Sequence, residues 1–382
     1  MKYDFIIFGG TGLQGRICAK DLLQSGYSIL LVGRDPTGIQ HLLKNKKAGF
    51  LKVDLKNESS ISQAIMKSKA KVVINCAELT FNIPIMNACL KTKTSLTDLG
   101  GLQKITKQQF SLDNQFKNKN ILCITGCGST PGISNVLTAH IIEDFDSVDT
   151  IDLGFAWDSN KKVFVTPYSI QSIFDEFTQP PVVLSDGKFF KSNRIKCQGT
   201  FNFKAVGKQT CYCIVHSEVY TFAKYFKSKG IKNVHYLAGF PKHSYDYIQN
   251  LIKQGYNSSK PTTINGINTT PLYYITQELK KIHPPKGYKE VENIWVRISG
   301  KKNDKPLKAE IDCIVKTEKG WESAGSNIDT GRTISIISQM LFKGEIKSSG
   351  VHAQEGCVPH NKFISELGKR HIKVYLNKKP IN

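Results

Sequence analysis

Short apolar segments alternate with longer amphipathic segments along the first third of the chain. The apolar segments are Tyr3–Phe8, Tyr27–Val32, Phe50–Asp54, Lys71–Cys76, Thr94–Thr97 and Ile121–Thr125. The segments between them space their apolar residues as helices do, over Leu13–Ser25, Asn57–Ser68, Ile83–Leu90 and Lys104–Phe116. Buried strands that alternate with helices are typical of a parallel sheet covered on both faces. We therefore predict an α/β fold that begins with a doubly wound Rossmann sheet.

After Gly126 the pattern changes, and strand-like segments dominate. A helical segment at Gly132–Ile142 is followed by strand-like segments at Val148–Trp157, Pro181–Leu184, Phe189–Phe190, Cys211–Val215, Asn293–Gly300 and Leu307–Thr317. Turn residues at Ser185–Lys188 and Gly300–Lys305 predict hairpins, so we expect a second, α+β domain with a mostly antiparallel sheet. We place the dinucleotide-binding domain at residues 1–125, completed by about 331–382, and the substrate and dimerisation domain at 126–330.

A glycine-rich turn follows the first predicted strand and opens the first predicted helix. Its glycines fit both G-x-G-x-x-G and G-x-x-G-x-x-G, and such glycines let backbone N–H groups approach a pyrophosphate at a helix N-terminus. The predicted cofactor-binding residues of this turn are Gly9, Gly10, Thr11, Gly12, Leu13, Gln14 and Gly15.

The end of the second predicted strand indicates which dinucleotide is bound. Arg34 stands where NAD-binding proteins usually carry an acid for the ribose 2′-hydroxyl, and a guanidinium suits a 2′-phosphate. We therefore predict NADP(H), while Asp35, one residue on, keeps NAD(H) open as the alternative. The later strand ends predict further cofactor contacts by Asp54, Asn75, Cys76 and Ala77.

A carboxylate precedes two glycines at the end of the fifth predicted strand, in Thr97–Gly101. In a crevice that holds a nicotinamide, Asp98 is placed for acid–base work or for anchoring an amine. A helix-capping or turn carboxylate fits the same pattern, and both interpretations stay open.

Composition excludes several other functions. The chain has 382 residues and a formal net charge of +22, but its basic residues form short scattered clusters, as in a solvated lysine-rich surface. No apolar run approaches the ~18 residues needed to span a bilayer. None of the ten cysteines forms a Cys-x-x-Cys pair, so we expect reduced thiols and no metal site. The expected protein is cytoplasmic and binds neither nucleic acid nor membrane.

Four segments together resemble the saccharopine dehydrogenase-like family, which includes saccharopine reductase, lysine 6-dehydrogenase and carboxynorspermidine dehydrogenase. The segments are Gly9–Gly15, Thr97–Gly101, Gly126–Asn135 and the closing Arg332-Thr333 with Gly350-Val351 and Glu355. The resemblance runs in the same order from residue 1 to about 376.

The resemblance implies an NAD(P)-dependent oxidoreductase that moves hydride between a nicotinamide and a carbon bearing nitrogen, in a substrate of the saccharopine or lysine type. It places Asp98 beside the substrate nitrogen as the catalytic residue. It also implies substrate contacts by Gly100, Gly101, Pro131, Gly132 and Asn135, with Arg332 as a carboxylate clamp. The sheet of the second domain would pair two copies in a homodimer.

Two alternatives remain. A short-chain-dehydrogenase-like reductase needs Tyr-x-x-x-Lys on the helix after the fifth strand, but this chain has the pattern only at Tyr220/Lys224, Tyr225/Lys229, Tyr256/Lys260 and Tyr375/Lys379. A non-catalytic sensor of NADP(H) would need only the first domain, which the sequence does not distinguish from that of an enzyme.

Overall fold

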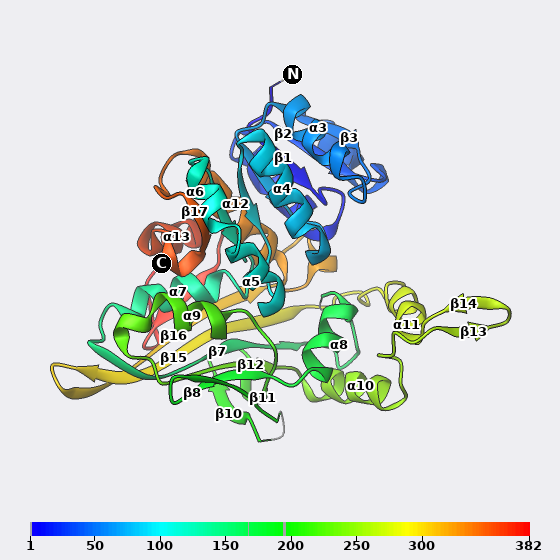
Figure 1. Cartoon of the computed structure of the whole chain (residues 1–382). Coiled ribbons are helices and arrows are strands. Elements are labelled where there is room, and N and C mark those ends of the chain that lie inside the picture. The colour runs from blue at the N-terminus through cyan, green and yellow to red at the C-terminus, as the bar shows by residue number, and fades with distance from the viewer. Residues whose placement is uncertain (1, 167, 194–195) are drawn as a thin grey trace.

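Two β-sheets, joined by helices that cross between them, make up the fold (Figure 1). The computed structural model describes residues 2–166, 168–193 and 196–382. Within these residues the first sheet is parallel and has the strand order β17-β6-β5-β4-β1-β2-β3. Its strands are β1 (Phe5–Phe8), β2 (Ile29–Gly33), β3 (Ala48–Lys52), β4 (Val72–Asn75), β5 (Ser95–Asp98), β6 (Leu122–Thr125) and β17 (Gly350–Ala353).

Side chains of alternate residues on these strands face two separate cores. Phe5 and Ile7 pack with helix α1 (Leu13–Gln24), whereas Ile6 and Phe8 pack with α3 (Glu58–Ser68) and α4 (Asn82–Thr92). The sheet is thus buried on both faces, which explains its unbroken apolar strands. Further helices on this domain are α2 (Gln40–Leu43), α5 (Gln103–Phe110) and α6 (Asp113–Asn118). The strand order reverses between β1 and β4, where doubly wound sheets bind their ligands.

The second sheet has the order β10-β11-β12-β7-β15-β16-β18-β19, with β8 and β9 attached beside β12. Its pairs are antiparallel except for β12 with β7, which confirms the predicted mostly antiparallel sheet. The strands are β7 (Ser147–Ser159), β8 (Val182–Ser185), β9 (Lys188–Lys191), β10 (Gln198–Phe203), β11 (Gly207–Cys213), β12 (Asn233–Gly239), β15 (Glu290–Lys302), β16 (Lys305–Lys316), β18 (Lys373–Leu376) and β19 (Lys379–Pro380).

The helices of the second domain lie between its sheet and the first domain or at one end of the sheet (Figure 1). They are α7 (Ile133–Ile142), α8 (Ile170–Thr178), α9 (Glu218–Tyr225), α10 (Lys242–Lys253) and α11 (Pro271–Leu279). A small hairpin of β13 (Thr262–Ile264) and β14 (Ile267–Thr269) projects beyond α11, where the sequence predicted a loop.

The C-terminal segment is shared between the two domains. Helix α12 (Ile328–Phe342) packs against α1, and β17 extends the parallel sheet, as the predicted completion of the first domain requires. Strand β18 instead pairs with β16, so residues 373–380 complete the second sheet, contrary to the predicted boundary. A short apolar strand such as β18 could pair with the edge of either sheet. The contacts of α13 (His360–Lys369) with α7 and α12 decide that β18 joins the second sheet.

Cys197 and Cys213 form a disulfide, with their Cα atoms 5.4 Å apart. The expectation that all cysteines are reduced is therefore wrong for this pair. The backbone N–H of Cys213 also donates to the carbonyl of Cys197, so the fold itself brings these two residues together.

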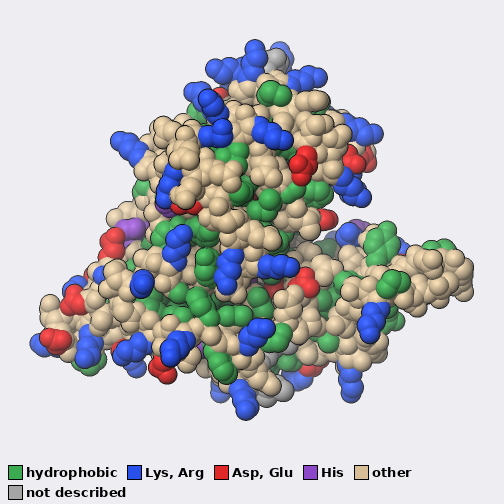
Figure 2. Space-filling view, viewed as in Figure 1, with side chains coloured by type: hydrophobic (Ala, Val, Ile, Leu, Met, Phe, Trp, Pro, Cys, Tyr) green, Lys and Arg blue, Asp and Glu red, His purple; other side chains and the backbone are tan. Residues whose placement is uncertain are grey.

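The molecular surface carries Lys and Arg side chains over both domains on the face shown in Figure 2, without one continuous basic stripe. None of the helices that the structure describes is long and apolar enough to cross a bilayer.

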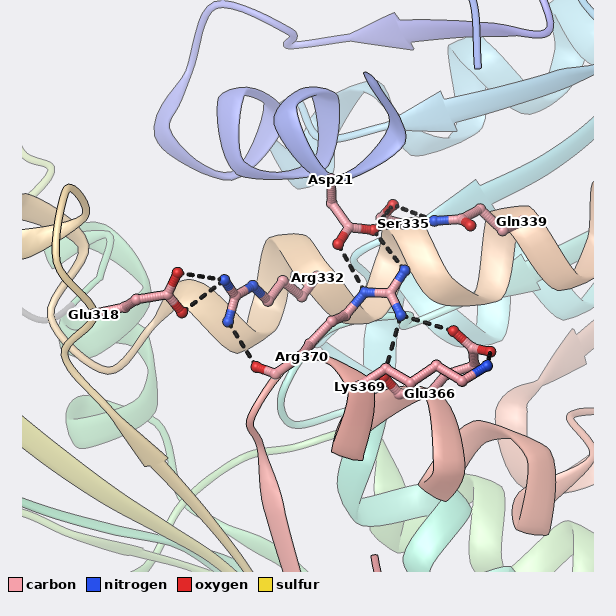
Figure 3. Close-up of polar contacts among 8 residues, drawn as sticks. All are labelled: Asp21, Glu318, Arg332, Ser335, Gln339, Glu366, Lys369 and Arg370. Atoms are coloured by element: carbon pink, nitrogen blue, oxygen red, sulfur yellow. Dashed lines mark hydrogen bonds and ion pairs between the residues drawn. The ribbon is translucent and has the colours of Figure 1, made fainter. Parts of the chain in front are cut away.

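A buried ion-pair network connects α1 with the C-terminal segment (Figure 3). The guanidinium of Arg370 donates to both carboxylate oxygens of Asp21, at 2.7 and 2.9 Å, and to Glu366 at 2.8 Å. Ser335 and Gln339 of α12 also donate to Asp21. Because the side chains of Asp21 and Arg370 are each only 11% exposed, this pair is a strong link between the first helix and the end of the chain.

Replacement of Arg370 by Met should lower the free energy of unfolding by about 3 kcal/mol, because it leaves the buried Asp21 carboxylate without its counter-ion. Urea denaturation measures this difference. The control is Lys369→Met, which removes only the more exposed ion pair with Glu366 and should cost at most about 0.5 kcal/mol. Equal losses in the two variants would contradict a special role for Arg370.

Candidate active site

The glycine turn after β1 has the geometry of a phosphate cradle. A Cβ on Gly9, whose φ is +71°, would lie 2.6 Å from the backbone nitrogen of Ala77, and one on Gly15 would collide with the carbonyl oxygen of Gly9. Gly12 is the N-cap of α1 and provides no side-chain cap. The first-turn N–H groups of α1 are thereby left for a ligand, and such groups bind a pyrophosphate.

The remaining residues of the turn support this cradle. The side chain of Thr11 packs against Gly33 at the end of β2. Leu13 packs on the core, and Gln14 donates to the carbonyl of Asn327 at 3.2 Å. Gly10 packs against Leu31.

Two arginines lie near the loop that follows β2, beside the glycine turn. Arg34 is exposed and has no hydrogen bond or ion pair with any described residue. The neighbouring Asp35 accepts hydrogen bonds from the backbone and side chain of Thr37 at 2.9 and 2.6 Å, which lower its pKa. Asp35 is thus engaged in its own loop, and Arg34 is free to meet a 2′-phosphate.

Arg16 is the second of these arginines, and it is not among the cofactor residues predicted from the sequence. Its Nη1 lies 3.5 Å from the carbonyl oxygen of Gly38, in the loop that begins with Arg34, and its Nε is buried with no partner in the described structure. The available signal was its position directly after Gly15, on the first turn of α1.

The other predicted cofactor residues divide into two groups. Asn75 is buried and donates to Asn82 at 2.8 Å while accepting from the backbone N–H of Ala77, so it shapes the loop of Cys76 and Ala77 against the glycine turn. Asp54 is exposed and accepts from the backbone N–H of Lys56, as a turn residue does.

Asp98 is completely buried at the end of β5. Its Oδ2 accepts from Gln109 at 2.6 Å, and its Oδ1 accepts from Thr125 at 3.0 Å and from the backbone N–H of Gly126 at 3.1 Å. Burial raises the pKa of Asp98 to about 6, partly offset by these hydrogen bonds. This placement favours a positioning role between the loops after β5 and β6, so catalysis by Asp98 stays a prediction.

The N-terminus of α7 is closed by the chain itself. Asn135 accepts from the backbone N–H of Gly132 at 2.9 Å, and the first amides of the helix donate to the carbonyls of Gly128 and Ser129. The peptide before Pro131 is cis, and Pro131, Gly132 and Asn135 are buried. The structure therefore does not support the expected substrate contacts of these three residues, because their polar groups already have partners.

Arg332 also differs from its expected role. Its guanidinium pairs with Glu318 at 2.7 Å and donates to the carbonyl of Arg370 at 3.0 Å (Figure 3). It lines a surface pocket with Asp21, near the C-terminal end of α1 and roughly 13 Å along that helix from the phosphate cradle. The structure does not support a carboxylate clamp at this position.

Gly100 and Gly101 lie where the two domains meet. A Cβ on Gly100 would lie 2.6 Å from Gly126, so the loops after β5 and β6 touch through their backbones. The space beside Gly101 is open, and its carbonyl accepts from the backbone N–H of Ser217 in the second domain, at 3.1 Å.

A buried polar cluster of the second domain adjoins this contact. Glu218 accepts from Ser134 of α7 at 3.1 Å and bonds Nδ1 of His216. The ring of His216 stacks on Tyr236, and the hydroxyl of Tyr236 donates to Thr130 at 2.6 Å. Spacing along the chain does not reveal this cluster, because Ser134 and Tyr236 come from elements far from His216 and Glu218 in the sequence.

Known proteins match the chain over both domains. The family model of the saccharopine dehydrogenase NADP-binding domain matches residues 5–124, and that of the saccharopine dehydrogenase C-terminal domain matches residues 128–372. Carboxyaminopropylagmatine dehydrogenase from Synechocystis sp. is 22% identical over 314 residues, or 78% of each chain. Trans-acting enoyl reductase from Mycobacterium tuberculosis is 26% identical over 37% of each chain.

Among solved structures, the apo saccharopine dehydrogenase (L-Glu forming) from Saccharomyces cerevisiae aligns over 100% of both chains, with a TM-score of 0.76 and 13% sequence identity. The shared fold confirms the predicted combination of a Rossmann sheet with a second, mostly antiparallel sheet.

Replacement of Asp98 by Asn should change how stability depends on pH. Because the pKa of Asp98 is raised in the folded state, this carboxyl stabilises the fold while it is protonated at low pH, and that contribution is lost as the pH rises from about 4 to about 6. The variant should therefore gain stability relative to the wild type over this range, by up to about 3 kcal/mol. Urea denaturation at several pH values measures the difference.

The matched control is Asp113→Asn. Burial raises the pKa of Asp113, but hydrogen bonds from Lys117 and from the backbone of Val351 lower it overall. Because the pKa of Asp113 is lowered rather than raised, the difference between this variant and the wild type should stay constant between about pH 5 and 7. A constant difference between Asp98→Asn and the wild type would show that folding does not raise the pKa of Asp98.

Proposed function

The chain belongs to the saccharopine dehydrogenase family, and on this premise we propose that it is an NADP(H)-dependent oxidoreductase acting on a C–N bond of an amino-acid substrate. NADP(H), when bound, supplies or accepts the hydride at the carbon that bears the nitrogen. The observation that carries the proposal is the contact between Gly101 and Ser217, which brings polar side chains of the second domain to the strand ends of the cofactor-binding sheet.

The cofactor proposal is supported by the residues around the cradle. The amides at the start of α1 would hold the pyrophosphate, and Arg34 and Arg16 would hold the 2′-phosphate. NAD(H) remains the alternative, but Asp35 is already bonded to Thr37 and would have to leave that turn to bind a 2′-hydroxyl.

For the substrate we propose the saccharopine and lysine types, in which an amine is oxidised to an imine or an imine is reduced. The name of the Synechocystis relative adds carboxyaminopropylagmatine, an extended amine, as a third type. A homodimer formed through the second sheet is part of the same proposal. The cytoplasmic location stays a prediction.

A non-catalytic NADP(H) sensor and a short-chain-dehydrogenase-like reductase are the competing functions. The sensor would bind the cofactor without turnover. The reductase would need a Tyr–Lys pair beside the nicotinamide, whereas Tyr220 and Lys224 lie on α9 of the second domain, with Lys224 over the ring of Phe110.

Turnover should be seen when NADPH is mixed with aminoadipate semialdehyde and glutamate, or when NADP+ is mixed with saccharopine, lysine or carboxyaminopropylagmatine. Absorbance at the nicotinamide band measures the rate, and omission of the amine component is the control. Cofactor binding without turnover of any of these substrates would favour the sensor.

Arg34→Ala and Arg16→Ala should each weaken NADPH binding by roughly ten- to a hundredfold, because each removes a charged hydrogen bond to the 2′-phosphate. The affinity for NADH should change by less than about threefold, since NADH lacks that group. Fluorescence titration measures both affinities.

Lys56→Ala is the control, because Lys56 is an exposed cation in the neighbouring loop and should matter little for either cofactor. A wild-type protein that already prefers NADH would contradict the cofactor assignment.

A further inference from the structure

His216 lies where the second domain meets the loops after β5 and β6, yet none of the roles assigned above uses it. Its neighbour Ser217 donates to the carbonyl of Gly101, and Glu218 accepts from Ser134 at the start of α7. His216 is 7% exposed and Glu218 is fully buried. The pair is thus fixed to both loops at the carboxyl edge of the parallel sheet, where a nicotinamide cofactor binds in this fold.

The ring of His216 is held from two sides. Nδ1 bonds the carboxylate of Glu218, and the ring stacks on Tyr236 with centroids 3.8 Å apart and planes 9° from parallel. Tyr236 is itself anchored, because its hydroxyl donates to Thr130. A carboxylate on one ring nitrogen sets the tautomer and orientation of the other.

The second ring nitrogen, Nε2, has no hydrogen-bond partner in the described part of the chain. His352 shows the contrast, because its Nδ1 bonds Tyr225 and its Nε2 bonds Ser348. A histidine that is bonded through both ring nitrogens, as His352 is, has no ring nitrogen left for a ligand. His216 instead has one nitrogen anchored and the other available.

Reduction of an imine requires a proton at the substrate nitrogen as well as hydride at the carbon. Asp98 cannot readily provide it, because both of its oxygens accept hydrogen bonds inside the loops. We propose that His216, oriented by Glu218, is the acid–base residue that exchanges this proton with the substrate nitrogen. The inference rests on the proposed function.

In the reducing direction, bound NADPH would supply the hydride that forms the new C–H bond and would leave as NADP+, and the π electrons of C=N would move to the nitrogen. That nitrogen takes the proton from Nε2 of the imidazolium, which leaves a neutral imidazole and an amine. Oxidation of the amine runs through the same groups in reverse.

The titratable groups that face His216 are Glu218 from α9, Glu176 from α8 and Tyr236 from β12, with Glu292 of β15 acting on Tyr236. Burial raises the pKa of Glu176 to about 7. A pH–rate profile therefore reports the cluster rather than one residue.

The test compares His216→Gln with His235→Gln, on the substrate pair that the wild type turns over. His235 is the matched control, because its Nδ1 also bonds a carboxylate, Asp152 at 2.8 Å, but its side chain is 30% exposed. We expect His216→Gln to lower kcat by roughly 10²- to 10⁴-fold and to bind NADPH within about twofold of the wild type. His235→Gln should retain wild-type kcat. Wild-type turnover by His216→Gln would overturn the proposal.

Two further measurements keep the outcome decisive. If His216→Gln fails to fold, as thermal melting would show, Glu218→Gln decides, because it keeps the ring but removes its anchor. An unchanged kcat in a folded Glu218→Gln protein overturns the proposal. The second measurement is the NMR signal of the His216 ring in the wild type without cofactor, titrated with lysine, saccharopine and carboxyaminopropylagmatine.

This NMR titration separates the two hypotheses. A protein without turnover refutes the proposed function, and a shifted His216 signal would still place this ring against the amine. No shift with any of the three amines in such a protein refutes the inference as well. Turnover by the wild type and by His216→Gln alike refutes the inference alone.

Discussion

Backbone contact between loops at the carboxyl edge of the parallel sheet is the constraint on which the structure depends. Gly9 touches the chain at Ala77, and Gly100 touches Gly126, each so closely that a Cβ would lie 2.6 Å from backbone atoms. The first contact joins the loops after β1 and β4, and the second joins the loops after β5 and β6. All four loops lie at the same edge of the sheet. The amides at the start of α1 lie at the same edge, where doubly wound sheets bind dinucleotides.

Polar groups at this edge fall into two kinds, according to whether the fold has already satisfied them. Asp98 and Asn135 have their hydrogen bonds inside the protein, and their burial is tolerated for that reason. Arg34 and Nε2 of His216 have no partner among the described residues. The groups that are already bonded inside the protein set the shape of the crevice. Only the groups without a partner can form hydrogen bonds to a ligand.

The two domains are interleaved along the chain rather than consecutive. The crossings of the chain between them fix how the two domains sit at the crevice. After the second domain the chain returns through α12, which packs on α1, and through β17, which extends the first sheet. It then crosses back, and β18 pairs with β16. The pair of Asp21 and Arg370 ties the first helix to this last crossing, so the position of His216 relative to Gly101 depends on contacts across the whole chain.

The sequence by itself determined the Rossmann sheet and the glycine turn, because each depends on residues close together in the chain. A strand buried on both faces must be apolar throughout, and a turn that approaches a phosphate must have glycines at fixed spacing. The tertiary structure alone decided that Asp98 faces inward, that Arg332 pairs with Glu318 and that His216 lies next to the contact between Ser217 and Gly101. Those placements depend on which distant segments pack together, and the periodicity of the sequence carries no information about that.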